Sequence, residues 1–106
     1  MLKRIKRRYL ALQIDTQNIA LPSEREFMDA IWGSITQMFG ESGASQANIV
    51  LINYSIDQKI VVIRVNLPAI INLRASIVTI TQIAQTKVAV HVLAVSGTIK
   101  ALAKKI

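Results

Sequence analysis

The chain has 106 residues, of which 52% are hydrophobic, and its net charge is +7. This length supports one domain with one core, and the apolar content excludes wholesale disorder. The absence of cysteine excludes disulfides and thiolate metal sites. The apolar runs are too short to cross a bilayer, and no secretory signal follows the basic start. We therefore expect a cytoplasmic protein with no membrane partner.

Positive charge is concentrated at the two ends of the chain. Five basic residues lie in the first eight positions and three in the last seven, whereas the segment between them has five basic and six acidic residues. A cluster that leads directly into a strand presents its charge at a fixed place, which favours a polyanion as partner. We expect residues 1–8 to be an arm that binds RNA or DNA. Its basic residues are Lys3, Arg4, Lys6, Arg7 and Arg8. The alternative interpretation, a solvated tail, stays open.

The first predicted elements are a strand at residues 9–14 and a helix that starts at Ser23. Ser23 and Glu26 have the spacing of a capping box, in which the serine oxygen accepts a backbone N–H and the glutamate reaches back. Apolar residues at helical spacing follow, and Gly40 is typical of a helix end. We expect residues 41–47 to form a polar loop.

The middle of the chain predicts a hairpin and then an ambiguous segment. Two runs rich in β-branched residues, 48–54 and 59–66, predict the hairpin. In residues 68–85, the Ile, Val and Thr content favours a strand, whereas the length and the apolar spacing favour a helix. We predict a helix, because Pro68 suits a first helical turn.

The last predicted elements are a strand at residues 87–95 and a short helix or turn at 99–105. The resulting order predicts one α+β domain over residues 9–106. Its four-stranded antiparallel sheet has both helices on one face, in the ferredoxin-like βαββαβ order that the RNA recognition motif also has. The last strand is apolar on both sides, so we expect another protein chain or the terminal segment to cover the other sheet face.

Base stacking on this sheet is not expected. An RNA recognition motif stacks bases on aromatic residues of its central strands, and the predicted third strand has none. Tyr9 and Tyr54 do not form the expected aromatic pair. Any RNA contact should therefore go to the backbone and shape of the RNA.

No group of residues in the sequence is typical of catalysis. His91 is the only histidine, and no carboxylate lies within thirty positions of it, so we interpret it as a strand residue rather than a metal ligand or general base. Ser96 lacks the acid–base partners of a catalytic triad. We predict no catalytic residue, no metal site and no cofactor bound by the protein.

The segment Ser96-Gly97-Thr98 has two compatible interpretations. Glycine permits a positive φ where the strand turns into the helix, and Ser or Thr caps the helix that follows. The hydroxyl and amide groups of such a turn also bind phosphate oxygens, here beside Lys100.

Three sequence elements together resemble a known family. They are Lys6-Arg7-Arg8-Tyr9, Ile63-Arg64-Val65 and Val95-Ser96-Gly97-Thr98-Ile99-Lys100. With them the chain resembles the family of protein component 2 of archaeal ribonuclease P, which is similar to a eukaryotic subunit shared by ribonuclease P and ribonuclease MRP. The hairpin turn and the loop after the first helix depart from the family pattern.

This resemblance implies an accessory subunit of ribonuclease P that assists a catalytic RNA in removing the 5′ leader of precursor tRNA. The RNA would use magnesium and perform the chemistry, so the chain alone would not be catalytic. The implied partners are the catalytic RNA, precursor tRNA indirectly, and the barrel-shaped protein component 3, in a heterotetramer where two copies of this chain meet. The resemblance adds four RNA-binding residues to the arm: Arg64, Ser96, Thr98 and Lys100.

Two other functions stay open at this point. One is a generic RNA-binding protein of ribosomal type that acts on a different RNA. The other is an interaction module whose basic termini only keep it soluble.

Overall fold

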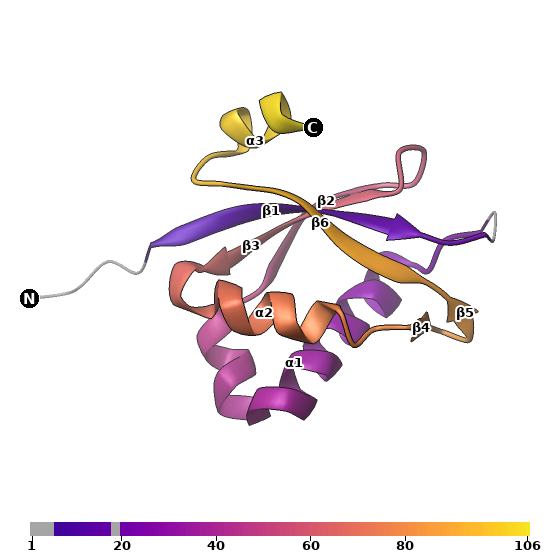
Figure 1. Ribbon diagram of the computed structural model, residues 1–106, viewed down its shortest axis with the longest axis horizontal. Helices are drawn as coiled ribbons and strands as arrows, with labels where there is room; N and C mark the ends of the chain where they lie inside the picture. The colour runs from indigo at the N-terminus through magenta and orange to yellow at the C-terminus, as the bar shows by residue number, and fades with distance from the viewer. Residues whose placement is uncertain (1–5, 18–19) are drawn as a thin grey trace, which may run out of the picture.

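The computed structural model describes residues 6–17 and 20–106. Its elements in chain order are β1 (Arg7–Asp15), α1 (Glu24–Ala47), β2 (Val50–Ser55), β3 (Ile60–Asn66), the 3-10 turn η1 (Leu67–Ala69), α2 (Ile70–Ile77), β4 (Gln82–Ile83), β5 (Thr86–Lys87), β6 (Ala89–Ser96) and α3 (Ile99–Lys105). Figure 1 shows α1 and α2 beneath the main sheet and α3 above it.

The main sheet has four strands in the order β2-β3-β1-β6, and each neighbouring pair is antiparallel. The first and last strands therefore lie side by side, so the two basic segments of the sequence meet in space. This arrangement confirms the predicted α+β fold with a ferredoxin-like order of strands and helices. A small β4–β5 hairpin is added to it.

The main core lies between the sheet and the helices α1 and α2. Alternate residues of β1 face it, and Leu10 and Leu12 are completely buried there. Phe27 and Ile31 of α1 and Leu73 of α2 pack against them. This layer fixes the sheet as a rigid platform for the residues on its other face.

The start of α1 confirms the sequence prediction. The Ser23 side chain accepts a hydrogen bond from the Glu26 backbone N–H at 3.1 Å, and the Glu26 carboxylate accepts one from the Ser23 backbone N–H at 2.9 Å. This reciprocal pair satisfies two amide groups that have no partner within the helix.

The predicted loop at residues 41–47 is wrong, because the chain turns at Gly40 and continues as helix to Ala47. Gly40 has φ 77°, a left-handed conformation that glycine adopts without a Cβ clash. The helical turns beyond it bury Ala44 and Ala47 against Ile35 of the preceding turns. In the sequence, two alanines among polar residues are too weak an apolar pattern to predict a helix.

The predicted helix at residues 68–85 is only partly correct. Helix α2 ends at Ile77, and residues 82–87 form the β4–β5 hairpin. Ala84 and Gln85 both have positive φ at the hairpin turn. The strand propensity of the β-branched residues is therefore realised only in the second half of the segment. There Ile80 and Ile83 pack into the main core.

Helix α3 covers part of the second face of the sheet. The sequence predicts that either another protein chain or the terminal segment covers this face, and α3 is the terminal segment. Leu102 is 1% exposed and packs with Ala11 of β1 and Val62 of β3. None of the helices in the described part of the chain is long and apolar enough to cross a membrane.

Candidate nucleic-acid interface

The basic residues of the arm lead into strand β1. Arg7 and Arg8 belong to β1, where they lie opposite Asn66 and Val65 of β3. The carbonyl of Lys6 accepts a hydrogen bond from the Leu67 backbone N–H at 2.8 Å, which ties this residue to the end of β3. The predicted contacts Lys3 and Arg4 lie outside the described residues.

Arg64, Tyr9 and Ser96 form a row across the sheet. Tyr9 in β1 lies directly opposite Arg64 of β3 on one side and Ser96 of β6 on the other. Side chains at directly opposed positions of antiparallel strands point to the same face. Tyr9 packs against the cluster under Leu102, so the row lies on the α3 side of the sheet.

The Ser96-Gly97-Thr98 turn has the predicted helix cap, but Gly97 does not have the predicted positive φ. Thr98 is the N-cap of α3, and its side chain accepts a hydrogen bond from the Ala101 backbone N–H at 3.1 Å. Ser96 is buried, and its hydroxyl oxygen lies 3.5 Å from the Thr98 backbone nitrogen, which donates to it. These two hydrogen bonds support the conformation of the turn, and its role in RNA binding stays a prediction.

Arg8 brings the arm to this turn. Its Nη1 donates to the Arg7 carbonyl at 2.9 Å, and a Cβ built on Gly97 would lie 3.8 Å from that same Nη1. The guanidinium group therefore lies next to the backbone of Gly97. A basic group from the start of the chain and the hydroxyl-bearing turn near its end form one continuous surface.

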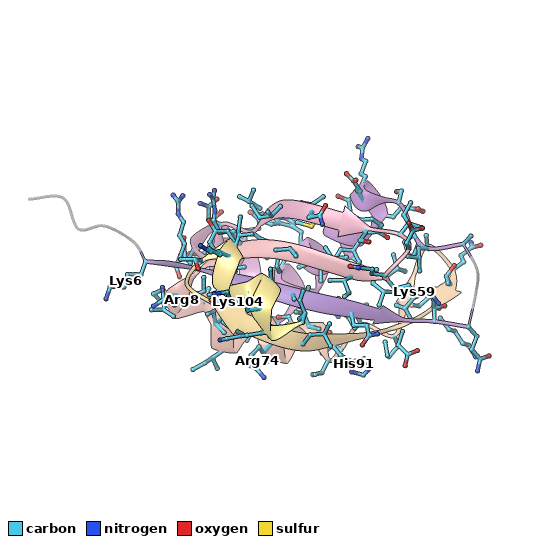
Figure 2. All side chains as sticks on the ribbon, turned by 90° about the horizontal axis from the view of Figure 1, so that it is seen from above. Lys6, Arg8, Lys59, Arg74, His91 and Lys104 are labelled. Carbon is cyan, nitrogen blue, oxygen red and sulfur yellow. The ribbon has the colours of Figure 1, made fainter. Side chains whose placement is uncertain are left out.

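Helix α3 adds lysines to this surface. Lys100 and Lys104 are exposed, whereas the Lys105 ammonium donates to the Val95 carbonyl at 2.8 Å and fastens the helix to β6. We call the combined group the basic end; it consists of Lys6, Arg7, Arg8, Arg64, Lys100 and Lys104. Figure 2 shows Lys6, Arg8 and Lys104 gathered at one end of the molecule, with Lys59 towards the other.

Carboxylates do not neutralise the basic end within the described part of the chain. The ion pairs found there join Arg25 to Asp29 and His91 to Asp15, each at 3.9 Å. The cations of the basic end therefore keep their charge available for an external anion. Such unpaired clusters raise the local potential and attract phosphates.

Helix α1 carries more acidic than basic residues. This helix contains four of the six acidic residues of the chain: Glu24, Glu26, Asp29 and Glu41. Trp32 is 45% exposed on it, between one hollow that Glu41 lines and another that Asp29 lines. Carboxylates repel phosphates, so this surface suits a protein rather than an RNA.

The two tyrosines of the sheet have different environments. Tyr54 faces the helices, contacts Phe27 edge-to-face and donates its hydroxyl to the Pro22 carbonyl. Burial, assisted by the carboxylates of Glu24 and Glu26, raises the pKa of Tyr54. Tyr9 lies on the other face, which agrees with the expectation that the two do not form a stacking pair.

Sequence reasoning did not find two features of this region. The row that places Tyr9 beside Arg64 depends on strand register, although the alternation of Tyr9 with buried Leu10 indicates which face it occupies. The approach of Asp15 to His91 joins residues far apart in the sequence. Both side chains are more than half exposed there, so their interaction is weak.

No group of three or more His, Cys, Asp or Glu residues in the described ranges could hold a metal ion. The groups described at the basic end are cations and hydrogen-bond donors, and such groups bind phosphates.

Comparison with known proteins decides the family. The model of the Rpp14/Pop5 family matches residues 8–106. The chain belongs to this family of ribonuclease P protein subunits. The matched residues include the row across the sheet and the turn before α3, and so contain most of the basic end.

Two curated relatives and one solved structure are similar to the chain. Ribonuclease P protein component 2 of Pyrococcus furiosus is 30% identical over 102 residues, which cover 96% of this chain and 83% of that protein. The protein of the same name from Halorubrum lacusprofundi is 28% identical over 96 residues, 89% of this chain and 60% of that protein. A chain in the cryo-EM structure of yeast ribonuclease MRP has the same fold, with a TM-score of 0.72 and 14% identity over 92% of this chain and 79% of that one.

Proposed function

We propose that this chain assists the catalytic RNA of ribonuclease P in removing the 5′ leader from precursor tRNA. The observation that carries the proposal is the convergence of basic residues from β1, β3 and α3 at one end of a family member. The residues proposed to contact RNA are those of the sequence prediction: Lys3, Arg4, Lys6, Arg7, Arg8, Arg64, Ser96, Thr98 and Lys100. Lys3 and Arg4 are included because of their positive charge alone.

The proposed mechanism is electrostatic. Folded RNA brings phosphates close together, and their repulsion must be offset by cations. Arginine and lysine side chains held on a rigid sheet offset part of it at fixed positions. The chain would thereby stabilise the active shape of the RNA and lower the concentration of magnesium that the RNA needs.

The chain has an accessory role in this proposal. Magnesium is bound and used by the RNA subunit, and the protein holds no cofactor of its own. Bond breaking belongs to the RNA, while the chain contributes binding and neutralisation. Its place of action is the cytoplasm, where precursor tRNA would be met indirectly through the assembled complex.

The proposed protein partners are component 3 of ribonuclease P and a second copy of this chain, in a heterotetramer. Exposed Trp32 of α1, with Asp29 and Glu41 lining the hollows beside it, supports a contact with protein on the side of the molecule away from α3. Tryptophan is typical of the anchoring residues of protein interfaces. Separate surfaces for RNA and protein allow both kinds of partner to bind together.

Reconstitution tests the function. The catalytic RNA, component 3 and this chain are mixed at a limiting magnesium concentration, and leader cleavage of precursor tRNA is measured. We expect cleavage to depend on this chain. Substitution of Lys6, Arg7 and Arg8 by Gln should restore the need for high magnesium and reduce the salt slope of RNA binding by about 2 to 3, since each lost phosphate contact contributes roughly 0.7 to 0.9.

A matched control removes the same charge elsewhere. Arg25 and Arg74 on the helix layer and Lys87 in β5, all replaced by Gln, should leave the magnesium requirement near that of the unmodified chain. Cleavage that proceeds without the chain, or equal loss in both triple variants, would contradict the proposal. RNA binding without any support of leader cleavage would instead indicate a generic RNA-binding protein.

A further inference from the structure

Tyr9 occupies the middle of the row that crosses the basic end. Arg64 lies opposite it in β3 and Ser96 opposite it in β6, while Arg7 and Arg8 precede it in β1. Directly opposed side chains on one face lie about 5 Å apart at their Cβ atoms. Arg7 shares the face of Tyr9, whereas Arg8 lies opposite core-facing Val65, so an RNA strand that contacts Arg7 and Arg64 passes over the tyrosine.

The ring of Tyr9 is held by packing on the sheet. The side chain is partly buried against the cluster of Ala11, Val62 and Leu102, which fixes its position on the sheet. Among the described residues, its hydroxyl has no hydrogen-bond partner. The hydroxyl of Tyr54, by contrast, is used within the fold, because it donates to the Pro22 carbonyl.

Arg64 also has an unused donor. Its Nε is buried and has no hydrogen-bond partner within the described part of the chain. A ligand cannot reach this buried atom, so a phosphate would accept from the outer nitrogens of the guanidinium group. Arg64 is only half-buried and lies directly opposite Tyr9, so a ligand bound by these nitrogens lies beside the tyrosine.

We propose that Tyr9 and Arg64 form a nucleotide site in which Arg64 binds a phosphate and the Tyr9 hydroxyl binds the ribose 2′-hydroxyl of the same nucleotide. This deepens the proposed function, and it rests on that function for RNA as the ligand. A 2′-hydroxyl adjoins the 3′-phosphate in every ribonucleotide, so two neighbouring side chains reach both groups. Tyr9 thereby makes the basic end selective for RNA over DNA.

Hydrogen bonding, rather than base stacking, is the role that this environment favours. The Tyr9 ring packs on Leu102 and its neighbours, so the ring is not a free platform for a base. The other aromatic residue of the sheet strands in the described chain, Tyr54, faces the helices. A single anchored tyrosine between cations is suited to the sugar and phosphate of one nucleotide.

The test uses the full chain and two fluorescein-labelled hairpins of one sequence, one of RNA and one of DNA. Fluorescence anisotropy gives both dissociation constants at one salt concentration. We expect the unmodified chain to prefer RNA, and Tyr9→Phe to lower that preference about fivefold to tenfold, the value of one hydrogen bond. Binding of the DNA hairpin should stay unchanged, because it has no 2′-hydroxyl.

Tyr54→Phe is the matched control, since it removes a tyrosine hydroxyl from the opposite face of the same sheet. Its ratio of RNA to DNA affinity should equal that of the unmodified chain. Arg64→Gln should weaken both hairpins alike and reduce the salt slope by roughly 0.7 to 0.9. Circular dichroism and thermal melting of each variant establish that it is folded.

The outcomes separate this site from the proposed function. If the chain supports leader cleavage but Tyr9→Phe keeps the full RNA preference, the nucleotide site is wrong and the function stands. Equal affinity of the unmodified chain for RNA and DNA hairpins also overturns the site. If the chain neither binds RNA nor supports cleavage, both proposals fall together.

Discussion

The two faces of the main sheet differ in how completely they are covered. On one face, Leu10, Leu12 and Ile63 pack beneath α1 and α2 and are fully buried. On the other, Leu102 of α3 covers only the centre, and Arg64 and Tyr9 lie beside it. Both faces belong to the same strands, so the difference comes from the alternation of side chains along each strand.

This difference separates stability from binding. The covered face contributes most of the buried apolar area, and hydrophobic burial is the main driving force of folding. The second face carries polar and basic groups whose cost of burial would be high, and these groups stay at its margin. A small domain can therefore change its binding residues on one face without losing the core on the other.

Leucine truncation on each face gives the largest expected effect. Leu12→Ala should lower the free energy of unfolding by about 3 kcal/mol, because the sheet and two helices enclose the cavity and it cannot collapse. Leu102→Ala should cost about 2 kcal/mol, since the short helix α3 can settle onto the sheet. Urea unfolding measures both. A larger loss for Leu102→Ala would mean that α3, and not the helix layer, holds the sheet.

Loss of the α3 cap has the next largest expected effect. Thr98→Ala removes the side-chain acceptor for the Ala101 backbone N–H and should cost about 1 kcal/mol. Thr98→Ser keeps an acceptor and serves as control. Amide hydrogen exchange should show faster exchange in α3 while β1 keeps its protection, because only the second face is affected. Uniform loss of protection across the sheet would contradict the separation of the two faces.

The smallest expected effect concerns Tyr54 on the covered face. Because its folded-state pKa is raised above the ordinary value of 10.0, protonated Tyr54 contributes stability below pH 10. That contribution is lost as the pH rises from 10 through the folded-state pKa. Tyr54→Phe should cost about 0.5 to 1 kcal/mol at neutral pH and flatten the alkaline loss. Denaturant unfolding at neutral and alkaline pH measures this, and an unchanged slope for the variant would contradict it.

Local patterns in the sequence predicted much of the fold. Alternating and β-branched residues indicated the strands, and the Ser23–Glu26 spacing indicated the start of α1. The same kind of signal predicted a Ser or Thr cap and a short helix or turn after it, and the structure has Thr98 as the cap of α3. These signals work because capping bonds and strand alternation involve residues only a few positions apart.

The failures lie where burial by distant residues decided the structure. Residues 41–47 look polar, but Ala44 and Ala47 become core residues when they meet Ile35. The segment after Ile77 has mixed helix and strand propensity. In the structure it forms the β4–β5 hairpin, in which Ile83 packs into the main core. Local propensity was too weak in both segments to oppose these contacts.

The binding surface was predicted as a composition but not as an arrangement. Charge and family resemblance identified the arm, Arg64 and the Ser96–Thr98 turn as one set of candidates. Their meeting depends on β1 pairing with both β3 and β6, which joins the two ends of the chain. Tyr9 entered the set only when the register placed it beside Arg64.

The amino-acid sequence by itself determined the α+β class, the basic character of both termini, the helix caps and the family to which the chain belongs. Each of these depends on residue type and short spacing, which folding does not alter. Only the tertiary structure decided which residues share a face and which cations lie together without carboxylates. Strand register and helix packing join residues far apart in the chain, and their energies come from contacts that exist only in the folded protein.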